Sequence, residues 1–255
     1  MQYFNPHEIK NKNKEIIRRK LIHHTGKNIS DSFAINLTTN YIIQSNLDEN
    51  CNILDLGPAS GNFANQLYEA GYKNIYGVDI DDYLSPDNRP LITEFKTADL
   101  SFDKIPWPDV SFDVITAWCV LPHLENPFHA TREIYRILKP DGIFIFTAPN
   151  ISSKASVSYF KKNNDFGSYH ANNNHLVIFT PALIEKTILK YFNILTIKNH
   201  IRHKIFNRGI KGLIRKTIYK LAQKTSKKMG IKIEKRWAYN TTYVLKKKDL
   251  ADNFN

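Results

Sequence analysis

A short loop with two glycines and an acid is the first feature of this sequence that could do chemistry. It reads Asp55-Leu-Gly57-Pro-Ala59-Ser-Gly61 and follows an apolar run that begins at Ile53. Glycines at a strand-to-helix turn let the backbone come close to a ligand. A dinucleotide loop would read G-x-G-x-x-G, whereas this loop has two glycines at another spacing. Because the carboxylate of Asp55 would repel a pyrophosphate, the loop favours a cationic ligand or one that carries an amino group.

Two further acids stand at the ends of later apolar segments. Asp79 lies in "YGVDID", 24 residues after Asp55, and Asp99 lies in "EFKTADL". The carboxyl ends of strands in an open parallel sheet border the ligand crevice, so both carboxylates are binding candidates. Each has a structural alternative: Asp79 could be a solvated acid at a strand end, and Asp99 could cap a turn.

Histidines are the candidates for acid–base chemistry. His123 follows the fourth apolar segment and is the first candidate for a general base, with a packing role as its alternative. His170 and His175 are the next catalytic candidates, and both are also candidates for substrate binding, together with Tyr169. The sequence has no H-E-x-x-H motif and no cysteines at ligand spacing, so we expect no metal site.

Alternating apolar and amphipathic segments must position these residues. Strands are predicted at 52–57, 74–80, 94–100, 111–121, 142–149, 193–201 and 241–248, and helices at 8–24, 30–44, 61–71, 126–142 and 180–192. Pro140 and Gly142 are expected to stop the fourth helix, and Thr180 with Pro181 to begin the fifth. Nearly continuous apolar strands between helices predict an α/β fold, a doubly wound and mostly parallel sheet covered on both faces.

Segment 151–174 interrupts this alternation. It is polar, rich in asparagine and serine, and too long for an ordinary connection. We interpret it as a lid or substrate loop, with a disordered surface insertion as the alternative. The chain is accordingly divided into an N-terminal helical segment (1–47), a core (48–200) that includes the lid, and a basic helical insertion with a closing strand (201–255).

The composition limits the domain organisation and the location of the protein. The chain has 255 residues, of which 42% are hydrophobic, which suits one large α/β domain with a real core. No apolar run approaches the ~18–20 residues of a membrane span. The N-terminus lacks an apolar signal core, so a cytoplasmic location is expected. Cys51 and Cys119 are expected to be buried small apolar residues rather than nucleophiles.

The positive charge is concentrated near the C-terminus. The net charge is +12, and residues 198–248 hold 17 of the 36 basic residues with a single acid. Within them, 209–230 carries an apolar stripe at helical spacing and a basic remainder. The alternatives are a surface helix, a helix in peripheral contact with an anionic membrane, and a binding element for a phosphate-bearing small molecule. Nucleic acid is least favoured, since the segment has few aromatic residues. The oligomeric state is open.

Taken together, these motifs resemble the class I S-adenosylmethionine-dependent methyltransferases, in the small-molecule group of types 11 and 12. The loop D-x-G-x-x-x-G is similar to that family's first motif. "TADLSFDKIPWPDVSFDV" resembles the family's "DxxxLPFxDxSFD", and "FDVITAWCVLPHLENP" followed by "REIYRILKPDG" resembles "FDxVxxxxxxxHLxxP…RxLKPGG". The resemblance covers residues 50–150 and continues weakly to 195. It implies a Rossmann-like sheet of seven strands whose last strand is antiparallel.

The resemblance also implies roles for individual residues. The glycine loop would hold the methionine part of S-adenosylmethionine, with Asp55 near its amino group. Asp79 would accept both ribose hydroxyls, Asp99 would accept from the adenine amino group, and the Leu100 N–H would donate to the adenine. Trp118 would either stack near the cofactor or belong to the core. The full set of expected cofactor-binding residues is Asp55, Gly57, Ala59, Gly61, Phe63, Asp79, Ile80, Asp99, Leu100 and Trp118.

The resemblance implies an enzyme that transfers a methyl group and releases S-adenosylhomocysteine. Our preferred acceptor is a hydroxyl on a sugar carried on a nucleotide or a lipid phosphate, as in surface-polysaccharide synthesis. The alternatives are a membrane-associated quinone or lipid methyltransferase, and a catalytically silent cofactor-binding subunit.

Overall fold

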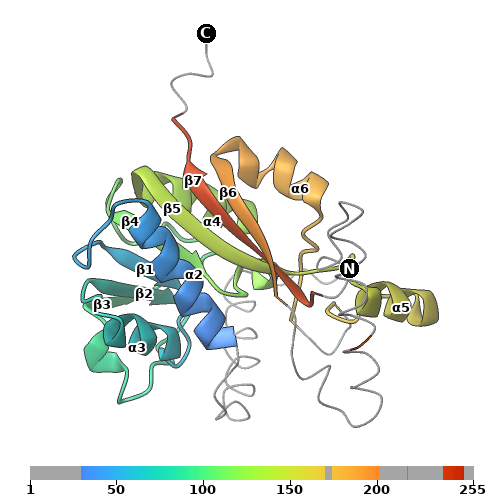
Figure 1. The fold of residues 1–255 in the computed structure, drawn as a ribbon, viewed down its shortest axis with the longest axis horizontal. Helices are drawn as coiled ribbons and strands as arrows, with labels where there is room; N and C mark the ends of the chain where they lie inside the picture. Colours follow the sequence, from blue (N-terminus) through green and yellow to red (C-terminus); the bar gives the residue numbers. More distant parts are fainter. Residues whose placement is uncertain (1–29, 170–173, 201–216, 218–237, 250–255) are drawn as a thin grey trace.

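The computed structural model describes residues 30–169, 174–200, 217 and 238–249. Its centre is a seven-stranded sheet in the order β3-β2-β1-β4-β5-β7-β6 (Figure 1). The strands are β1 (Ile53–Leu56), β2 (Ile75–Asp79), β3 (Glu94–Thr97), β4 (Phe112–Ala117), β5 (Leu138–Pro149), β6 (Phe192–His200) and β7 (Asn240–Lys247). The helices predicted at 8–24 and in 209–230 lie outside the described residues.

Strand directions confirm the predicted sheet. β1 pairs in parallel with β2 and β4, β2 with β3, and β4 with β5. β7 is antiparallel to both β5 and β6, as expected for the last strand. The strand order reverses between β1 and β4, so the crevice at the carboxyl ends of these two strands is the place where a ligand is expected.

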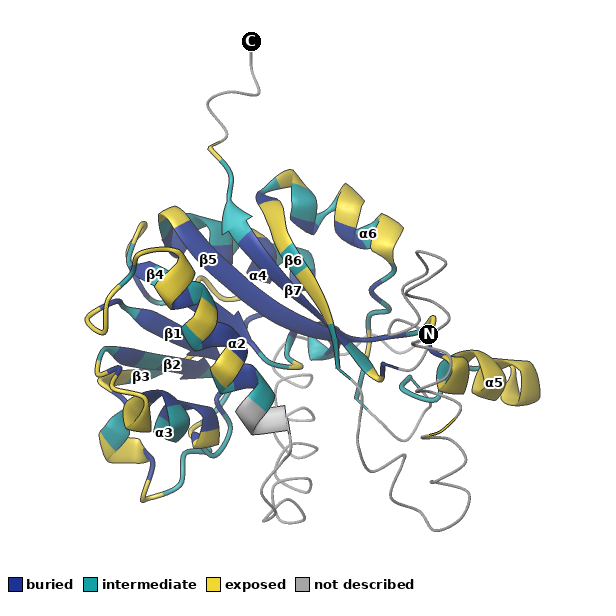
Figure 2. Cartoon of the chain, in the orientation of Figure 1, coloured by how far each residue is buried: buried dark blue, intermediate teal, exposed yellow. Residues whose placement is uncertain are grey.

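Two apolar layers sandwich the sheet. α2 (Ser30–Gln44) and α3 (Asn62–Glu69) pack on one face, against side chains such as Ile53 and Val114. α4 (Pro127–Ile137) and α6 (Pro181–Lys186) pack on the other face, against Leu54 and Ile115. Neighbours in a strand thus point to opposite faces, and both faces are buried, which is why the strands read as continuous apolar runs (Figure 2).

The predicted helix over 126–142 is too long. α4 ends at Ile137, and β5 begins at Leu138, so Pro140 and Gly142 lie inside a strand rather than at a helix end. The pairing with β4 slips here, since Phe112 faces Leu138 whereas Val114 faces Ile143. Proline lacks the N–H that a regular ladder needs, so an irregular stretch of strand accommodates it.

The second half of the chain differs from the prediction at two points. Segment 151–174 is not a plain loop, because α5 (Lys154–Asn163) lies within it and the hydroxyl of Ser153 caps that helix. The helix predicted at 180–192 is split into α6 and the 3₁₀ turn Ile188–Lys190. Its start is confirmed, since the Thr180 hydroxyl accepts the Leu183 N–H at 3.1 Å.

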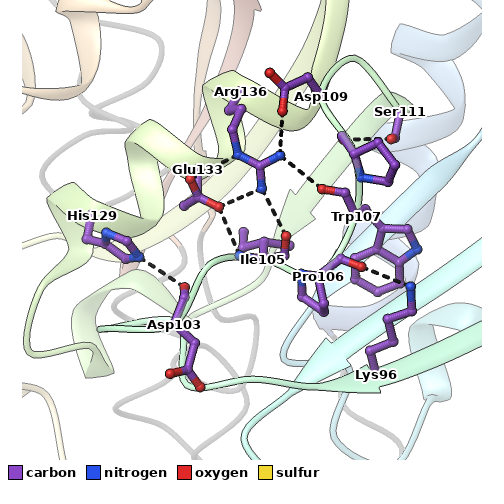
Figure 3. Close-up of polar contacts among 11 residues, drawn as sticks. Lys96, Asp103, Ile105, Pro106, Trp107, Asp109, Ser111, His129, Glu133 and Arg136 are labelled. Atoms are coloured by element: carbon purple, nitrogen blue, oxygen red, sulfur yellow. Dashed lines mark hydrogen bonds and ion pairs between the residues drawn. The ribbon is translucent and has the colours of Figure 1, made fainter.

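A polar network anchors the connection between β3 and β4 to α4 (Figure 3). The Arg136 guanidinium donates to Asp109 at 2.8 Å and to Glu133 at 2.6 Å, and also to the carbonyl oxygens of Ile105 and Trp107. Glu133 in turn accepts the Ile105 N–H at 2.9 Å. These bonds tie residues 105–109 of the connection to α4. Among the described helices, none has the length and apolar character of a membrane span.

Candidate active site

The loop after β1 turns through three left-handed residues. Gly57, Ala59 and Gly61 have φ angles of 66°, 50° and 82°. Gly61 is also the N-cap of α3, and the Gly57 N–H donates to the Val78 carbonyl at 2.8 Å. Only glycine adopts this backbone region without cost, so Ala59 holds a left-handed conformation that is strained for a residue with a side chain.

Substitutions at two of these residues are expected to have unequal effects on stability. A Cβ at Gly57 would lie 2.7 Å from Val120 Cγ2 and would strain the backbone. We therefore expect Gly57→Ala to lower the free energy of unfolding by about 1–3 kcal/mol. Ala59→Gly is the matched control, and it is expected to stay within about 1 kcal/mol because relief of strain offsets the entropy of the unfolded chain. Urea titration measures both, and equal losses would contradict the conformational argument.

Asp55 and Asp79 are two acids at this loop without a described counter-ion. Asp55 is 3% exposed and accepts the hydroxyl of Thr116 at 2.6 Å. Burial, aided by the nearby charge of Asp79 and opposed by the Thr116 hydroxyl, raises the pKa of Asp55 to about 7. Among described residues, neither acid forms an ion pair with a basic side chain. Such a site favours a ligand that brings positive charge.

Asp79 closes the loop onto the end of β2. Its carboxylate accepts the Ile80 N–H at 2.7 Å and the Ala59 N–H at 3.3 Å. Burial raises the pKa of Asp79 to about 6, against the lowering effect of these two N–H groups. Asp79 therefore lies beside the glycine loop, as the sequence predicted, and its oxygens are held in a fixed orientation.

Three other cofactor candidates, Asp99, Leu100 and Trp118, lie outside the glycine loop. Asp99 is buried and accepts the Ser101 N–H at 3.0 Å, which is the turn-capping contact considered as its alternative. Leu100 lies in the core beneath α4. Trp118 packs edge-on against Phe63, with ring centroids 5.6 Å apart. Its indole Nε1 is buried without a hydrogen-bond partner among the described residues, so the ring has both a core contact and an unused donor.

A second group of candidates gathers after β4. His123 ends the 3₁₀ turn Leu121–His123, and its ring centroid lies 4.4 Å from that of His175. Tyr169 completes the group, with its ring 5.3 Å from His175. The Leu176 N–H donates to the Pro122 carbonyl at 2.7 Å, which ties the two segments together. The structure thus joins three of the predicted residues, whereas His170 lies outside the described residues.

Backbone contacts set the tautomer of both imidazoles. His123 Nδ1 lies 3.0 Å from the Asn174 carbonyl oxygen, and His175 Nδ1 contacts the Ser168 carbonyl oxygen. A carbonyl only accepts, so Nδ1 carries the proton in each neutral ring and Nε2 is the basic nitrogen. Burial raises the pKa of Tyr169 to about 12, which leaves its phenol neutral at physiological pH. The group can therefore offer a base and a hydroxyl.

The sequence did not predict the surroundings of Cys119 and Thr116. Cys119 was expected to be buried, but it is exposed at the end of β4, and its N–H donates to the Thr147 hydroxyl at 2.7 Å. Cys51 is buried as predicted, and burial raises its pKa to about 12. The sequence around Thr116 does not indicate this contact, because Thr116 on β4 meets Asp55 only when β4 pairs with β1.

The part of the chain that carries the glycine loop is similar to known proteins. Residues 54–146 match the family described as "Methyltransferase domain". The chain is 32% identical over 133 residues to a ubiquinone/menaquinone biosynthesis C-methyltransferase of Rickettsia akari, covering 47% of this chain and 52% of that protein. It is 25% identical over 103 residues to a dimethylglycine N-methyltransferase of Parasynechococcus marenigrum, covering 38% and 37%. The chain therefore spans less than two thirds of these curated relatives.

A solved structure extends the likeness over most of the chain. The S-adenosylmethionine-dependent methyltransferase of Thermotoga maritima superposes with a TM-score of 0.57 at 15% identity, covering 92% of this chain and 99% of that one. At this identity the likeness concerns the fold. The conserved architecture is the Rossmann-like sheet with its antiparallel seventh strand.

Proposed function

We propose that this chain transfers a methyl group to a hydroxyl of a small-molecule acceptor. The chain belongs to the class I S-adenosylmethionine-dependent methyltransferases, and residues 54–146 form its methyltransferase domain. One observation carries the proposal. A glycine loop with two acids follows β1 and β2, and a histidine pair follows the adjacent strand β4. A site for a cationic ligand and a candidate base therefore share one edge of the sheet.

The residues of the loop fit S-adenosylmethionine, the donor of this family. Two acids, Asp55 and Asp79, lie at this loop with no ion pair among the described residues, which suits a donor that carries positive charge. The carboxylate of Asp55 would pair with the donor's amino group, and Asp79 would accept from the ribose hydroxyls. Trp118 Nε1 and Asp99 would face the remaining polar groups of the donor. When bound, the donor supplies an activated methyl group on a sulfonium.

The chain's own contribution is alignment and proton removal. His123 Nε2 would take the proton of the acceptor hydroxyl, and the Asn174 carbonyl would hold the imidazole in the tautomer that can do so. His175 and Tyr169 would orient the acceptor beside it. Alignment alone can lower the barrier by up to ~7–11 kcal/mol.

Donor binding is expected to depend on pH through Asp55. Below its pKa of about 7 the carboxyl is neutral and loses its attraction for a cation, so donor affinity should fall by up to about tenfold per pH unit. Asp55→Asn should bind the donor more weakly at pH 8 and lose the pH dependence between 6 and 8. Calorimetry from pH 5.5 to 8 measures this, and an unchanged profile would show that Asp55 does not face the donor.

The same variant is expected to be more stable at pH 8. The folded pKa of Asp55 is above the unfolded value, so the native state binds more protons between about pH 4 and 7, and stability falls as pH rises through that window. Asp55→Asn removes this penalty. Thermal unfolding at pH 8 checks the sign, and a less stable variant would contradict the burial argument.

For the acceptor, we propose a sugar hydroxyl carried on a lipid phosphate or a nucleotide, supported by the positive charge of residues 198–248. The likeness to a ubiquinone/menaquinone biosynthesis methyltransferase favours a quinone or lipid acceptor as the second candidate. A mass-shift screen with the methyl donor against nucleotide sugars, glycolipids and quinols tests all of these. Donor binding without turnover on any acceptor would instead indicate a silent subunit.

Apart from Thr217, the basic segment 209–230 lies outside the described residues, and its contact with an anionic membrane stays part of the proposal. Replacing Lys211, Arg215, Lys216, Lys220 and Lys224 with glutamine should abolish co-sedimentation with vesicles containing anionic lipid, since each basic residue contributes about 1 kcal/mol. The wild-type chain with zwitterionic vesicles is the control. Equal sedimentation of variant and wild type would exclude an electrostatic contact.

A further inference from the structure

A cavity of about 500 Å³ lies between α6 and the β5-β7-β6 end of the sheet. Its lining includes Ala148 at the end of β5, Ile197 near the end of β6 and Tyr243 near the start of β7. β5 and β6 are both antiparallel to β7, so their carboxyl ends share one edge, the edge that carries the candidate site. The volume is in the ~300–1,000 Å³ range of small-molecule pockets.

The lining of this cavity is mainly apolar. Ten of its fifteen residues are aliphatic, aromatic or proline, namely Ala148, Pro149, Ile151, Phe179, Pro181, Ile184, Leu189, Ile194, Ile197 and Tyr243. The other five are Asn150, Ser152, Glu185, Asn199 and Thr241, of which Glu185 is exposed and is the one charged residue among the described lining. Three of the five bond to the protein itself. Asn150 Nδ2 donates to the Ala238 carbonyl at 3.1 Å, and the Thr241 hydroxyl donates to Asn199 at 3.2 Å. No lysine or arginine is among the described lining residues, so the cavity favours hydrocarbon over phosphate.

Phe179 joins the cavity to the histidine group. Its side chain lines the cavity, while its backbone lies against the Tyr169 hydroxyl. Tyr169 contacts His175, and His175 contacts His123. A molecule with an apolar chain in the cavity would therefore have its polar end near the candidate base.

α5 begins close to the cavity. Ile151 and Ser152 line the cavity and precede Ser153, the N-cap of the helix. No α5 residue is buried, and Figure 2 shows the helix mostly in the colour of exposed residues. Val157, Tyr159 and Phe160 are 38–41% exposed. Its three charged residues are all lysines. Exposed apolar side chains flanked by lysines are typical of helices that touch a lipid surface.

We propose that this cavity binds the hydrocarbon part of an amphiphilic acceptor, so that the methyl acceptor is lipid-like and not a free nucleotide sugar. The inference rests on the proposed function, because it assigns the acceptor of that reaction. The apolar chain occupies the cavity between α6 and the sheet, its polar end reaches His123, and α5 faces the lipid surface from which the molecule enters.

The test uses the fluorescence of N-phenyl-1-naphthylamine, an apolar dye, bound to the full chain. Straight-chain alcohols from butanol to dodecanol should displace it, with affinity rising about fourfold per added methylene until the cavity is full. A nucleotide sugar should not displace it. Ile197→Trp should fill the cavity and weaken dye binding at least tenfold, as should Ile194→Trp, which faces the same space.

Leu195→Trp is the matched control, since Leu195 is on the same strand, is 42% exposed against 44% for Ile197, and does not line the cavity. It should bind the dye like the wild type. Equal binding by all variants, or no dependence on alcohol length, would overturn the inference. Calorimetry with the donor separates the two claims. Donor binding without alcohol binding overturns the cavity assignment alone, whereas alcohol binding without donor binding overturns the proposed function.

Discussion

His123→Ala is expected to lower kcat by about 10²–10⁴-fold while leaving donor affinity unchanged, because it removes the candidate base without touching the glycine loop. The reason lies in the geometry after β4. The Asn174 carbonyl holds Nδ1, so Nε2 is the nitrogen that can accept a proton. Steady-state kinetics on the acceptor found in the screen, together with donor calorimetry, measures both quantities.

Two controls separate a base from a packing residue. His129 also donates to a backbone carbonyl, that of Asp103 at 3.0 Å, but it lies on α4 away from the histidine pair, so His129→Ala should keep full turnover. His123→Gln retains polarity and much of the volume, and it should lose turnover like the alanine variant. Normal turnover in His123→Gln would make His123 a scaffold residue.

Asp79→Ala is expected to weaken donor binding by about 10²–10⁴-fold. Each hydrogen bond to a charged group contributes about 1.5–3 kcal/mol, and the carboxylate would accept two from the ribose. The loss also releases the N–H groups of Ala59 and Ile80, which loosens the loop that would hold the donor. Calorimetry at pH 8, where Asp79 is ionised, gives the dissociation constant directly.

Asp87 provides the matched control for this experiment. It is an exposed acid in the segment that follows β2, and Asp87→Ala changes the net charge by the same amount. Its donor affinity should equal that of the wild type. If both variants bind the donor equally well, the glycine loop is not the donor site and the ribose role of Asp79 is wrong.

The two experiments probe different halves of one crevice. Asp79 belongs to the strands on one side of the point where the order reverses, and His123 follows β4 on the other side. A donor held after β1 and β2 and an acceptor held after β4 and β5 would therefore meet above the β1–β4 pair. Affinity should respond to the first half and turnover to the second.

The sequence by itself determined the features whose cause is local. Glycine at 57 and 61 indicated a tight turn after the first strand, and both residues have positive φ angles. The alternation of apolar runs with amphipathic segments predicted the sheet, and Thr180 before Pro181 predicted a helix start that the structure confirms. These signals depend on a residue and its neighbours within one or two turns, so they are readable without the fold.

Only the tertiary structure decided which distant residues meet and how deeply they are buried. Asp55 and Thr116 are 61 residues apart, and His123 and Asn174 are 51 apart. The raised pKa of Asp55 follows from burial in the sheet, which its own segment does not reveal. Pro140 was misplaced for the same reason, because its irregular position in β5 depends on pairing with β4. Contacts across strands set burial, charge and cavity shape, and those contacts exist only once the sheet has formed.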